Sequence, residues 1–359
     1  MLKKIFMLMI LLVMSRAEAG GWSPEMRIGI LSGVNQVSLK VSAPCVMINA
    51  AKGNVLGKIP AGGSFIVDFG HLKLNAIEIR PEKIPLQNLQ TEIDGKKYFG
   101  GVTINKEKNS LTVINLVPVE EYLRGVVSKE MSPTFPIGAL KAQTVAARSF
   151  ALKNRKRHVA EGFDLCNSTH CQVYIGVADY DSIDRAIDET RGEVLTYKEK
   201  VADTNFHTDS GGMTASAEEV WGGKVPYLIA VKEIIERGEA WTVKVSAKDF
   251  SSRFGENFGD VQSVKITDKT FSGRVQSAQI VGSKRTLTLA GSEFRRKFSL
   301  PSTLFDMKFT GDEIIFTGYG HGHGVGMSQI GARDYARLGW SYEKILAHYY
   351  KGTKLKKLY

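Results

Sequence analysis

Residues 117–153 read VPVEEYLRGVVSKEMSPTFPIGALKAQTVAARSFALK, and within this stretch the hydrophobic period of the chain changes from strand-like to helical. Apolar residues recur at helical spacing after Pro118, which suits the first position of a helix, and Ser132-Pro133 would end that helix. Pro136 then opens a second helix, whose basic C-terminal end suits the helix dipole. We therefore predict two consecutive helices here.

The sequence before these helices predicts a β-rich region. Short segments there alternate in polarity or are rich in β-branched residues, and glycine-containing turns separate them. The expected strands are residues 26–31, 37–41, 64–68, 76–79, 98–104 and 111–115.

Strands and helices are mixed in the rest of the chain, without a strict βαβ rhythm. We expect a short helix near 182–190, a hairpin over 193–208, a strand-rich stretch over 225–316, a glycine-rich segment at 318–326, and helices near 328–338 and 341–350. This mixture favours an α+β fold. We divide the chain into residues 1–19, a β-rich N-terminal region (20–115) and a mixed α/β region (116–359).

The first residues predict export. Lys3 and Lys4 precede an apolar run over residues 5–14, which is too short to span a bilayer, and Ala17-Glu18-Ala19 has the small-x-small pattern of a cleavage site. We read residues 1–19 as a signal peptide. No later stretch is apolar enough to cross a membrane, so we expect an exported protein without a membrane span after cleavage.

Charge and cysteine content limit the classes of partner. The formal net charge of +11 suits an anionic polymer such as cell-wall material, and a basic surface without a specific partner is the alternative. No nucleic-acid-binding motif is present, so we expect no nucleic-acid partner. Three cysteines do not make a disulfide framework, and we expect Cys45 to be a small buried hydrophobe.

Three charged residues interrupt the apolar faces of the two predicted helices. Glu130 lies on the apolar face of the first, and Lys141 and Arg148 lie about two turns apart on the second. Because an unpaired buried charge is costly, they would either line a charged cleft or form a structural ion-pair cluster.

A cleft with a single inward carboxylate restricts the chemistry. A sheltered glutamate keeps its proton more readily, so Glu130 could act as an acid near neutral pH. Ordinary glycosidases need two carboxylates. One is enough if the sugar supplies its own nucleophile, as in lytic transglycosylation, where the muramic 6-hydroxyl closes a 1,6-anhydro ring.

A second cluster contains His158, Cys166, His170 and Cys171 within a short segment. Two thiolates and two imidazoles suit tetrahedral zinc, and four protein ligands would make that zinc structural. A Cys166–Cys171 disulfide is the alternative in an exported protein, and free thiols are a third possibility.

Two glycine-rich segments carry the remaining candidates. In GHGHGVGMSQ (320–329), His321 and His323 would face the same side of an extended chain, either lining a substrate groove or binding a metal, unless the segment is only a tight turn. In HTDSGGMT (207–214), His207 and Ser210 would be a candidate serine nucleophile pair, but the G-x-S-x-G elbow is missing.

Several of these segments, taken together and in this order, resemble the stage II sporulation protein D family, also called the amidase-enhancer family. The resemblance covers about residues 95–353. The motifs that carry it are VPVEEYLRGVVSKEM (117–131), ALKAQTVAARSFAL (139–152), FDLCNSTHCQVYIG (163–176), SGGMT and VWGGKVPYL (within 210–228), and GYGHGHGVGMSQIGARDYARLGWSYEKILAHYYKGT (318–353).

The resemblance implies a peptidoglycan lytic transglycosylase that prefers strands stripped of stem peptides, with a deep groove in residues 116–359. It places the catalytic glutamate at Glu130 and its supporting cations at Lys141 and Arg148. Some members bind zinc through the His/Cys loop, which the chemistry itself does not require. We assign His207, Ser210, His321, His323 and Gln329 to substrate binding or catalytic support.

Two rival interpretations remain. Other members of the family are amidase enhancers, so the chain could be a non-catalytic wall-binding activator of a cell-wall amidase. It could also be a metal-dependent hydrolase that uses His321 and His323. In each case, we expect the protein to act in the periplasm or the cell-wall space, on glycan strands or beside an amidase.

Overall fold

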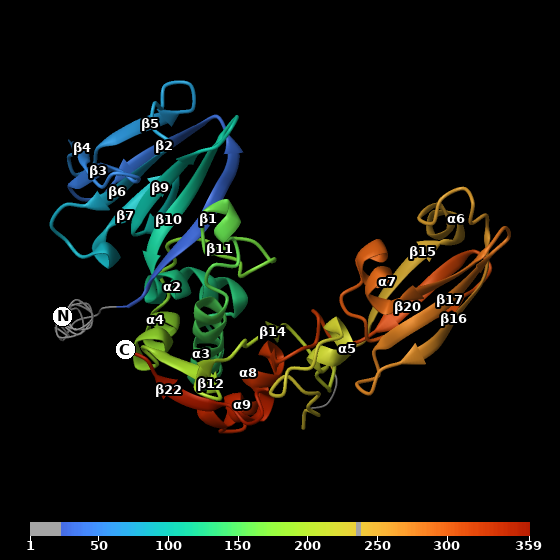
Figure 1. The fold of residues 1–359 in the computed structure, drawn as a ribbon. Helices are drawn as coiled ribbons and strands as arrows, with labels where there is room; N and C mark the ends of the chain where they lie inside the picture. The colour runs from blue at the N-terminus through green and yellow to red at the C-terminus, as the bar shows by residue number, and fades with distance from the viewer. Residues whose placement is uncertain (1–22, 235–237) are drawn as a thin grey trace, which may run out of the picture.

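The structure is a computed structural model that describes residues 23–234 and 238–359 (Figure 1). The predicted signal peptide lies outside these residues. Helices and strands are both abundant and several sheets are present, so the α+β prediction is confirmed. Among the described residues, no helix combines the length and apolarity that crossing a bilayer requires.

The N-terminal region consists of two sheets. A seven-stranded sheet has the order β11 (Leu165–Cys166), β1 (Glu25–Val34), β10 (Leu111–Pro118), β9 (Gly101–Lys106), β6 (Ala76–Pro81), β3 (Cys45–Asn49) and β4 (Val55–Ile59). A four-stranded sheet has the order β5 (Ser64–Asp68), β2 (Gln36–Val41), β7 (Gln90–Ile93) and β8 (Lys96–Phe99). Cys45 is fully buried in this region, as expected.

The expected strand over 98–104 is two strands in the structure. Gly100 separates β8 from β9 with a φ of +88°. A Cβ at this position would lie 1.9 Å from the carbonyl oxygen of Leu116, so the sharp turn requires glycine. The chain there passes from the four-stranded to the seven-stranded sheet.

The predicted helix pair forms α2 (Val119–Glu130) and α3 (Ile137–Lys153). Pro118 is the extended N-cap of α2 and not its first helical residue. The expected helices near 182–190, 328–338 and 341–350 are α4 (Asp181–Glu189), α8 (Gln329–Arg337) and α9 (Tyr342–Tyr349). All four helices α2, α4, α8 and α9 contact α3, so helices from distant parts of the sequence pack in one layer (Figure 1).

Small sheets complete this layer. The expected hairpin forms between β12 (Glu193–Tyr197) and β13 (Lys200–Val201), and β22 (Lys354–Lys357) adds to β12. The last residues of the expected hairpin do not belong to it. They form β14 (Phe206–His207), which pairs in parallel with β21 (Met327–Ser328). This pairing brings the two glycine-rich segments together.

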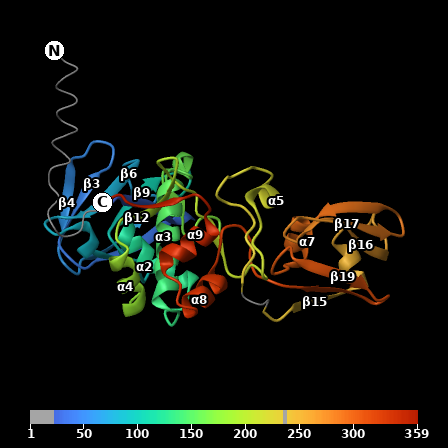
Figure 2. The same cartoon turned by 90° about the horizontal axis from the view of Figure 1, so that it is seen from below.

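Residues 241–318 form a unit with its own phenylalanine-rich core, which the sequence-based division did not separate. Its sheets are β15 (Trp241–Ser246), β20 (Glu313–Gly318) and β19 (Phe305–Phe309), and β16 (Val261–Lys269), β17 (Val275–Gly282) and β18 (Thr286–Ala290). Its helices are α6 (Ala247–Ser252) and α7 (Gly291–Phe298). Figures 1 and 2 show this 241–318 unit at one end of the molecule, beyond the loops around α5 (Ala217–Trp221).

Candidate active site

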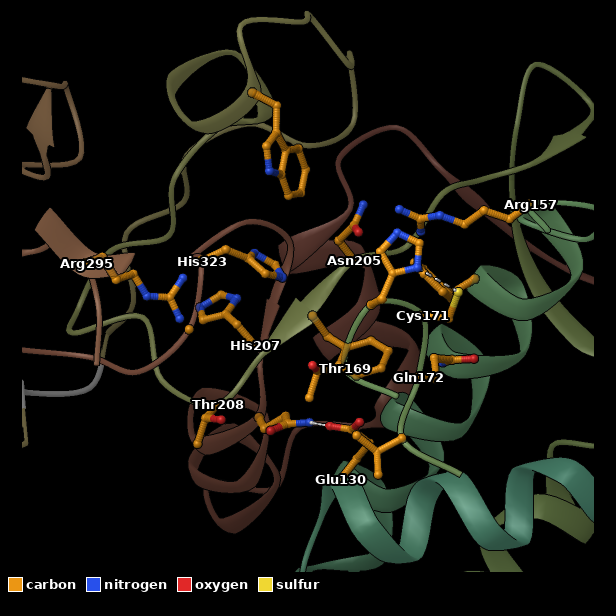
Figure 3. A pocket seen from close by; sticks show the side chains of 17 residues that line it. Glu130, Arg157, Thr169, Cys171, Gln172, Asn205, His207, Thr208, Arg295 and His323 are labelled. Atoms are coloured by element: carbon orange, nitrogen blue, oxygen red, sulfur yellow. Dashed lines mark hydrogen bonds between the residues drawn. The ribbon is translucent and has the colours of Figure 1, made fainter. Parts of the chain in front are cut away.

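Glu130 is the last residue of α2, and it lines a pocket of about 490 Å³. Gln329, the first residue of α8, donates a hydrogen bond from Nε2 to Glu130 Oε2 over 3.0 Å (Figure 3). Burial raises the pKa of Glu130, and the Gln329 hydrogen bond and the Lys129 charge oppose that shift more weakly. The pocket therefore makes the protonated form of Glu130 more favourable than it is for an exposed glutamate.

The pocket lies where several distant segments meet. Its lining comes from the end of α2, α3 and the turn after it, residues 169–173 of the His/Cys loop, residues 205–208, α5, α7 and the glycine-rich segment (Figure 3). Among the described residues that line it, Glu130 is the only carboxylate. If carboxyl chemistry takes place here, a single carboxyl must serve as both acid and base.

Two histidines of the pocket wall are held neutral in opposite tautomers. Burial lowers the pKa of His207 well below its usual value and that of His323 to about 4. His207 Nδ1 lies 3.1 Å from the carbonyl oxygen of Val325, so Nδ1 carries the proton. His323 Nδ1 instead accepts from the Val325 amide over 3.0 Å, so its proton is on Nε2, and a hydrogen bond with the Phe206 backbone opposes the lowering of its pKa.

This arrangement leaves His207 Nε2 as a hydrogen-bond acceptor without a partner among the described groups, although it is buried. A buried polar atom without a protein partner is uncommon. Beside it, Trp221 is 52% exposed, and its ring centroid lies 5.4 Å from that of His323. The wall thus presents an aromatic surface to the pocket, and one buried nitrogen of the lining residue His207 has no partner.

The structure separates His321 from His323, which corrects the expectation that they face the same side. The chain is not extended there, because Gly320, Gly322 and Gly324 have φ values of +73°, +108° and +85°. His321 is exposed and pairs through its backbone with Asp209, whereas His323 faces the pocket. The described residues therefore offer no two-histidine metal site in this segment.

Ser210 also lies outside the pocket lining. It is fully buried, and its hydroxyl donates to the carboxylate of Glu233, which also accepts from the Tyr349 hydroxyl over 2.5 Å. This network ties the 207–214 loop to α9. Ser210 therefore acts in packing, and the serine-nucleophile interpretation has no support.

The structure does not bring Lys141 and Arg148 to Glu130. Lys141 forms an ion pair with Glu189 of α4, and neither cation lines the pocket. Arg148 is fully buried and makes a bidentate pair with Glu120, with Nε···Oε1 and Nη2···Oε2 distances of 2.9 and 2.7 Å. For these two residues, the structure agrees with the ion-pair alternative and corrects the charged-cleft expectation.

The His/Cys cluster assembles as the sequence suggests. The four ligand atoms of His158, Cys166, His170 and Cys171 all lie within 4.8 Å of one another. His158 Nε2 lies 3.2 Å from His170 Nδ1 and 3.4 Å from Cys171 Sγ, and each sulfur lies 3.7 Å from His170 Nδ1. Tetrahedral zinc bonds would place ligand atoms about 3.3–3.8 Å apart.

Two further observations fit a metal at the cluster. The Glu161 carboxylate lies 2.8 Å from His158 Nδ1, which assigns the proton to Nδ1 and leaves Nε2 free as a ligand. Cys166 and Cys171 are free thiols in the structure, which does not form the disulfide alternative. Because His170 and Cys171 also line the pocket (Figure 3), the cluster holds one of its walls.

Sequence reasoning missed most of the residues that line the pocket, and Trp221, Arg157 and Arg295 are the three with the clearest capacity to bind a ligand. Trp221 lay in a quoted motif, but a single tryptophan gives no chemical signal without its surroundings. Arg157 comes from the basic turn that follows α3, and Arg295 comes from the strand-rich stretch, where no motif drew attention to it. Only the folded chain shows that these segments meet.

Two family models match the chain. One, described as "Stage II sporulation protein", matches residues 107–197, which include α2, α3 and the His/Cys loop. The other, described as a domain of unknown function, matches residues 239–326, which contain the 241–318 unit and the start of the glycine-rich segment.

Similar proteins cover most of the chain. Stage II sporulation protein D of Bacillus subtilis (strain 168) is 31% identical over 311 residues, which cover 81% of this chain and 90% of that protein. An uncharacterized protein of Brachyspira hyodysenteriae is 34% identical over 295 residues, 79% of each chain. The amidase enhancer of Bacillus subtilis is 30% identical over 337 residues, which cover 78% of this chain and 47% of that protein.

Proposed function

We propose, from the premise that this chain belongs to the stage II sporulation protein D family, that it is an exported peptidoglycan lytic transglycosylase with Glu130 as its single acid/base. One observation carries the proposal. Glu130 is the only carboxyl among the described residues that line the pocket, and burial raises its pKa. The pocket also has room for a sugar beside it.

The proposed reaction uses the two protonation states of Glu130 in turn. The acid gives its proton to the glycosidic oxygen as the bond from C1 of N-acetylmuramic acid breaks, which releases the 4-hydroxyl of N-acetylglucosamine. The carboxylate then takes the proton of the muramic 6-hydroxyl as that oxygen bonds to C1. The product carries a 1,6-anhydro ring, Glu130 regains its proton, and no water is consumed.

The opposite wall suits a sugar ring. The half-exposed indole of Trp221 would pack against the apolar face of a pyranose. Gln329 would orient the Glu130 carboxyl through the hydrogen bond already present. Binding of this kind fixes the glycosidic bond relative to the acid.

Product analysis tests the proposal. The purified protein, incubated with peptide-free glycan strands, is expected to generate anhydromuramyl ends, which mass spectrometry detects as products lighter by one water than hydrolysed ends. The name of the related amidase enhancer supports a second candidate, a non-catalytic activator of a cell-wall amidase. Unchanged strands, together with faster cleavage of peptidoglycan by an added amidase, would favour that candidate.

We propose further that a structural zinc ion is held by His158, Cys166, His170 and Cys171, where it would cross-link the loop that carries one wall of the pocket.

Cys171→Ser is expected to lower the zinc content from one ion per chain to near zero and to reduce the thermal midpoint. Elemental analysis and calorimetry measure both. The control for zinc content is Cys45→Ala, because Cys45 is not one of the four cluster residues, and it should leave one zinc ion per chain. Absence of zinc from the wild type, with a Cys166–Cys171 disulfide found by peptide mapping, would contradict this.

We place the protein in the periplasm or the cell-wall space, because the sequence of residues 1–19 has the pattern of a signal peptide. Peptidoglycan glycan strands are the proposed partner, and a cell-wall amidase is a second one.

A further inference from the structure

Arg295 brings an uncompensated positive charge to the pocket. Its Nε donates a long hydrogen bond to the Leu300 carbonyl oxygen over 3.4 Å, and no described carboxylate forms an ion pair with it. Burial lowers the pKa of this guanidinium. A partly buried arginine of this kind lacks the anion that usually accompanies it.

Arg295 is fixed in place by the 241–318 unit. It lies on α7, and two residues of the same helix, Phe294 and Phe298, are buried in the unit's core. A second arginine of the unit, Arg274, reaches under the glycine-rich segment and donates to the Ser210 carbonyl oxygen over 3.0 Å. The unit is therefore anchored to the pocket wall that Arg295 joins.

The pocket as a whole is cationic. Arg157 lines it together with Arg295, and Figure 3 shows the two arginines on opposite sides of the cavity. His207 and His323 are neutral, because burial lowers the pKa of each. The only lining carboxyl among the described residues, Glu130, holds its proton more readily than usual. This balance of charge favours a ligand with an anionic group.

Glycan strands offer one such group next to the bond that would be cut. The lactyl substituent of muramic acid ends in a carboxylate when no stem peptide is attached, and in a neutral amide when one is. A guanidinium binds a carboxylate through charge-assisted, often bidentate hydrogen bonds, which an amide cannot replace.

We propose that Arg295 is a specificity-determining residue that pairs with the free lactyl carboxylate of a muramoyl residue, so that the 241–318 unit recognises peptide-free glycan. This inference rests on the proposed function. It assigns a role to a segment that matches a domain of unknown function. Arg295 acts in binding, and the proton transfers remain with Glu130.

Two substrates and three variants test this role. The substrates are peptide-free strands with free lactyl carboxylates and the same strands converted to methylamides, which removes the charge without adding the bulk of a peptide. The variants are Arg295→Gln, Arg295→Lys and, as matched control, the exposed neighbour Arg296→Gln, which does not line the pocket. The quantity compared is the ratio of kcat/KM for the free strands to that for the methylamides.

The wild type and Arg296→Gln are expected to prefer the free carboxylate by about tenfold. Arg295→Gln should bring the ratio close to one by slowing only the free strands, and Arg295→Lys should restore part of the preference. An unchanged ratio in Arg295→Gln, or an equal loss on both substrates, would overturn the proposal.

A binding measurement separates this inference from the proposed function. In a Glu130→Gln background, fluorescence anisotropy with labelled strands gives Kd for the free, methylamide and stem-peptide-bearing forms, whether or not the protein cleaves them. Arg295→Gln should weaken binding of the free form alone, by about tenfold. Weakened binding of the peptide-bearing form would identify a stem-peptide carboxylate as the ligand and would overturn the lactyl assignment. Lack of anhydro products with this binding pattern intact would reject only the proposed reaction.

Discussion

Replacing Glu130 by glutamine is expected to lower the rate of glycan cleavage by a factor of about 10³, within the range that a general acid/base usually provides. Glutamine has nearly the same shape, and its amide oxygen still accepts the hydrogen bond that Gln329 donates over 3.0 Å. It cannot give a proton to the glycosidic oxygen or take one from the 6-hydroxyl. The measurement is the rate at which anhydromuramyl ends appear on peptide-free strands.

The pH dependence of the wild type provides a second signature of the same group. Because burial raises the pKa of Glu130, the acid form persists to a higher pH than for an exposed glutamate. Activity should fall as the pH rises through this raised value. The residual rate of Glu130→Gln should not follow that decline.

Thermal stability separates loss of chemistry from loss of fold. The pKa of Glu130 is raised in the folded protein, so the folded state loses stability as the pH rises above the pKa of the unfolded chain. Glutamine carries no such penalty, and the midpoint of Glu130→Gln at neutral pH should equal or exceed that of the wild type. An active Glu130→Gln variant would remove Glu130 from the mechanism. If the thermal midpoint of Glu130→Gln fell well below that of the wild type, loss of fold could account for its inactivity. The pH profile of the wild type would then decide whether Glu130 is the acid.

Local patterns in the sequence were sufficient to find most of the regular structure. The apolar period changes near residue 117, and α2 and α3 begin within two residues of that change and of Pro136, respectively. The His/Cys loop was also recognisable, because its four candidate ligands lie close together in the sequence and in space. In both cases the determining interactions span few residues.

The errors arose where the partner was distant or the backbone unusual. Lys141 and Arg148 were placed on the correct helix, but helical spacing does not reveal that Glu189 and Glu120 neutralise them. His321 and His323 were paired as in an extended chain, and the positive φ values of the glycines around them separate their side chains. Arg295 meets the pocket only because the 241–318 unit packs against it.

Removing the charge of Arg148 is expected to destabilise the protein by about 3–5 kcal/mol, because it leaves Glu120 as an unpaired buried carboxylate. Arg148 and Glu120 are 0% and 1% exposed. Arg148 also donates from Nη1 to the Glu193 carbonyl oxygen over 3.1 Å, so the pair links α2, α3 and β12. Arg148→Met keeps the length of the aliphatic stem and should show this loss in the free energy of unfolding measured with urea.

A surface ion pair provides the matched control for Arg148→Met. Lys356 and Glu199 lie 3.2 Å apart with side chains 51% and 74% exposed, so Lys356→Met should cost at most about 1 kcal/mol. The double variant Glu120→Leu with Arg148→Met should recover much of the lost stability, since neither charge is then left alone. If Arg148→Met instead cost no more than Lys356→Met but abolished cleavage, Arg148 would act in catalysis, as the family resemblance implies. The buried bidentate geometry argues against that result, because a guanidinium already engaged by a carboxylate has little capacity left for a sugar.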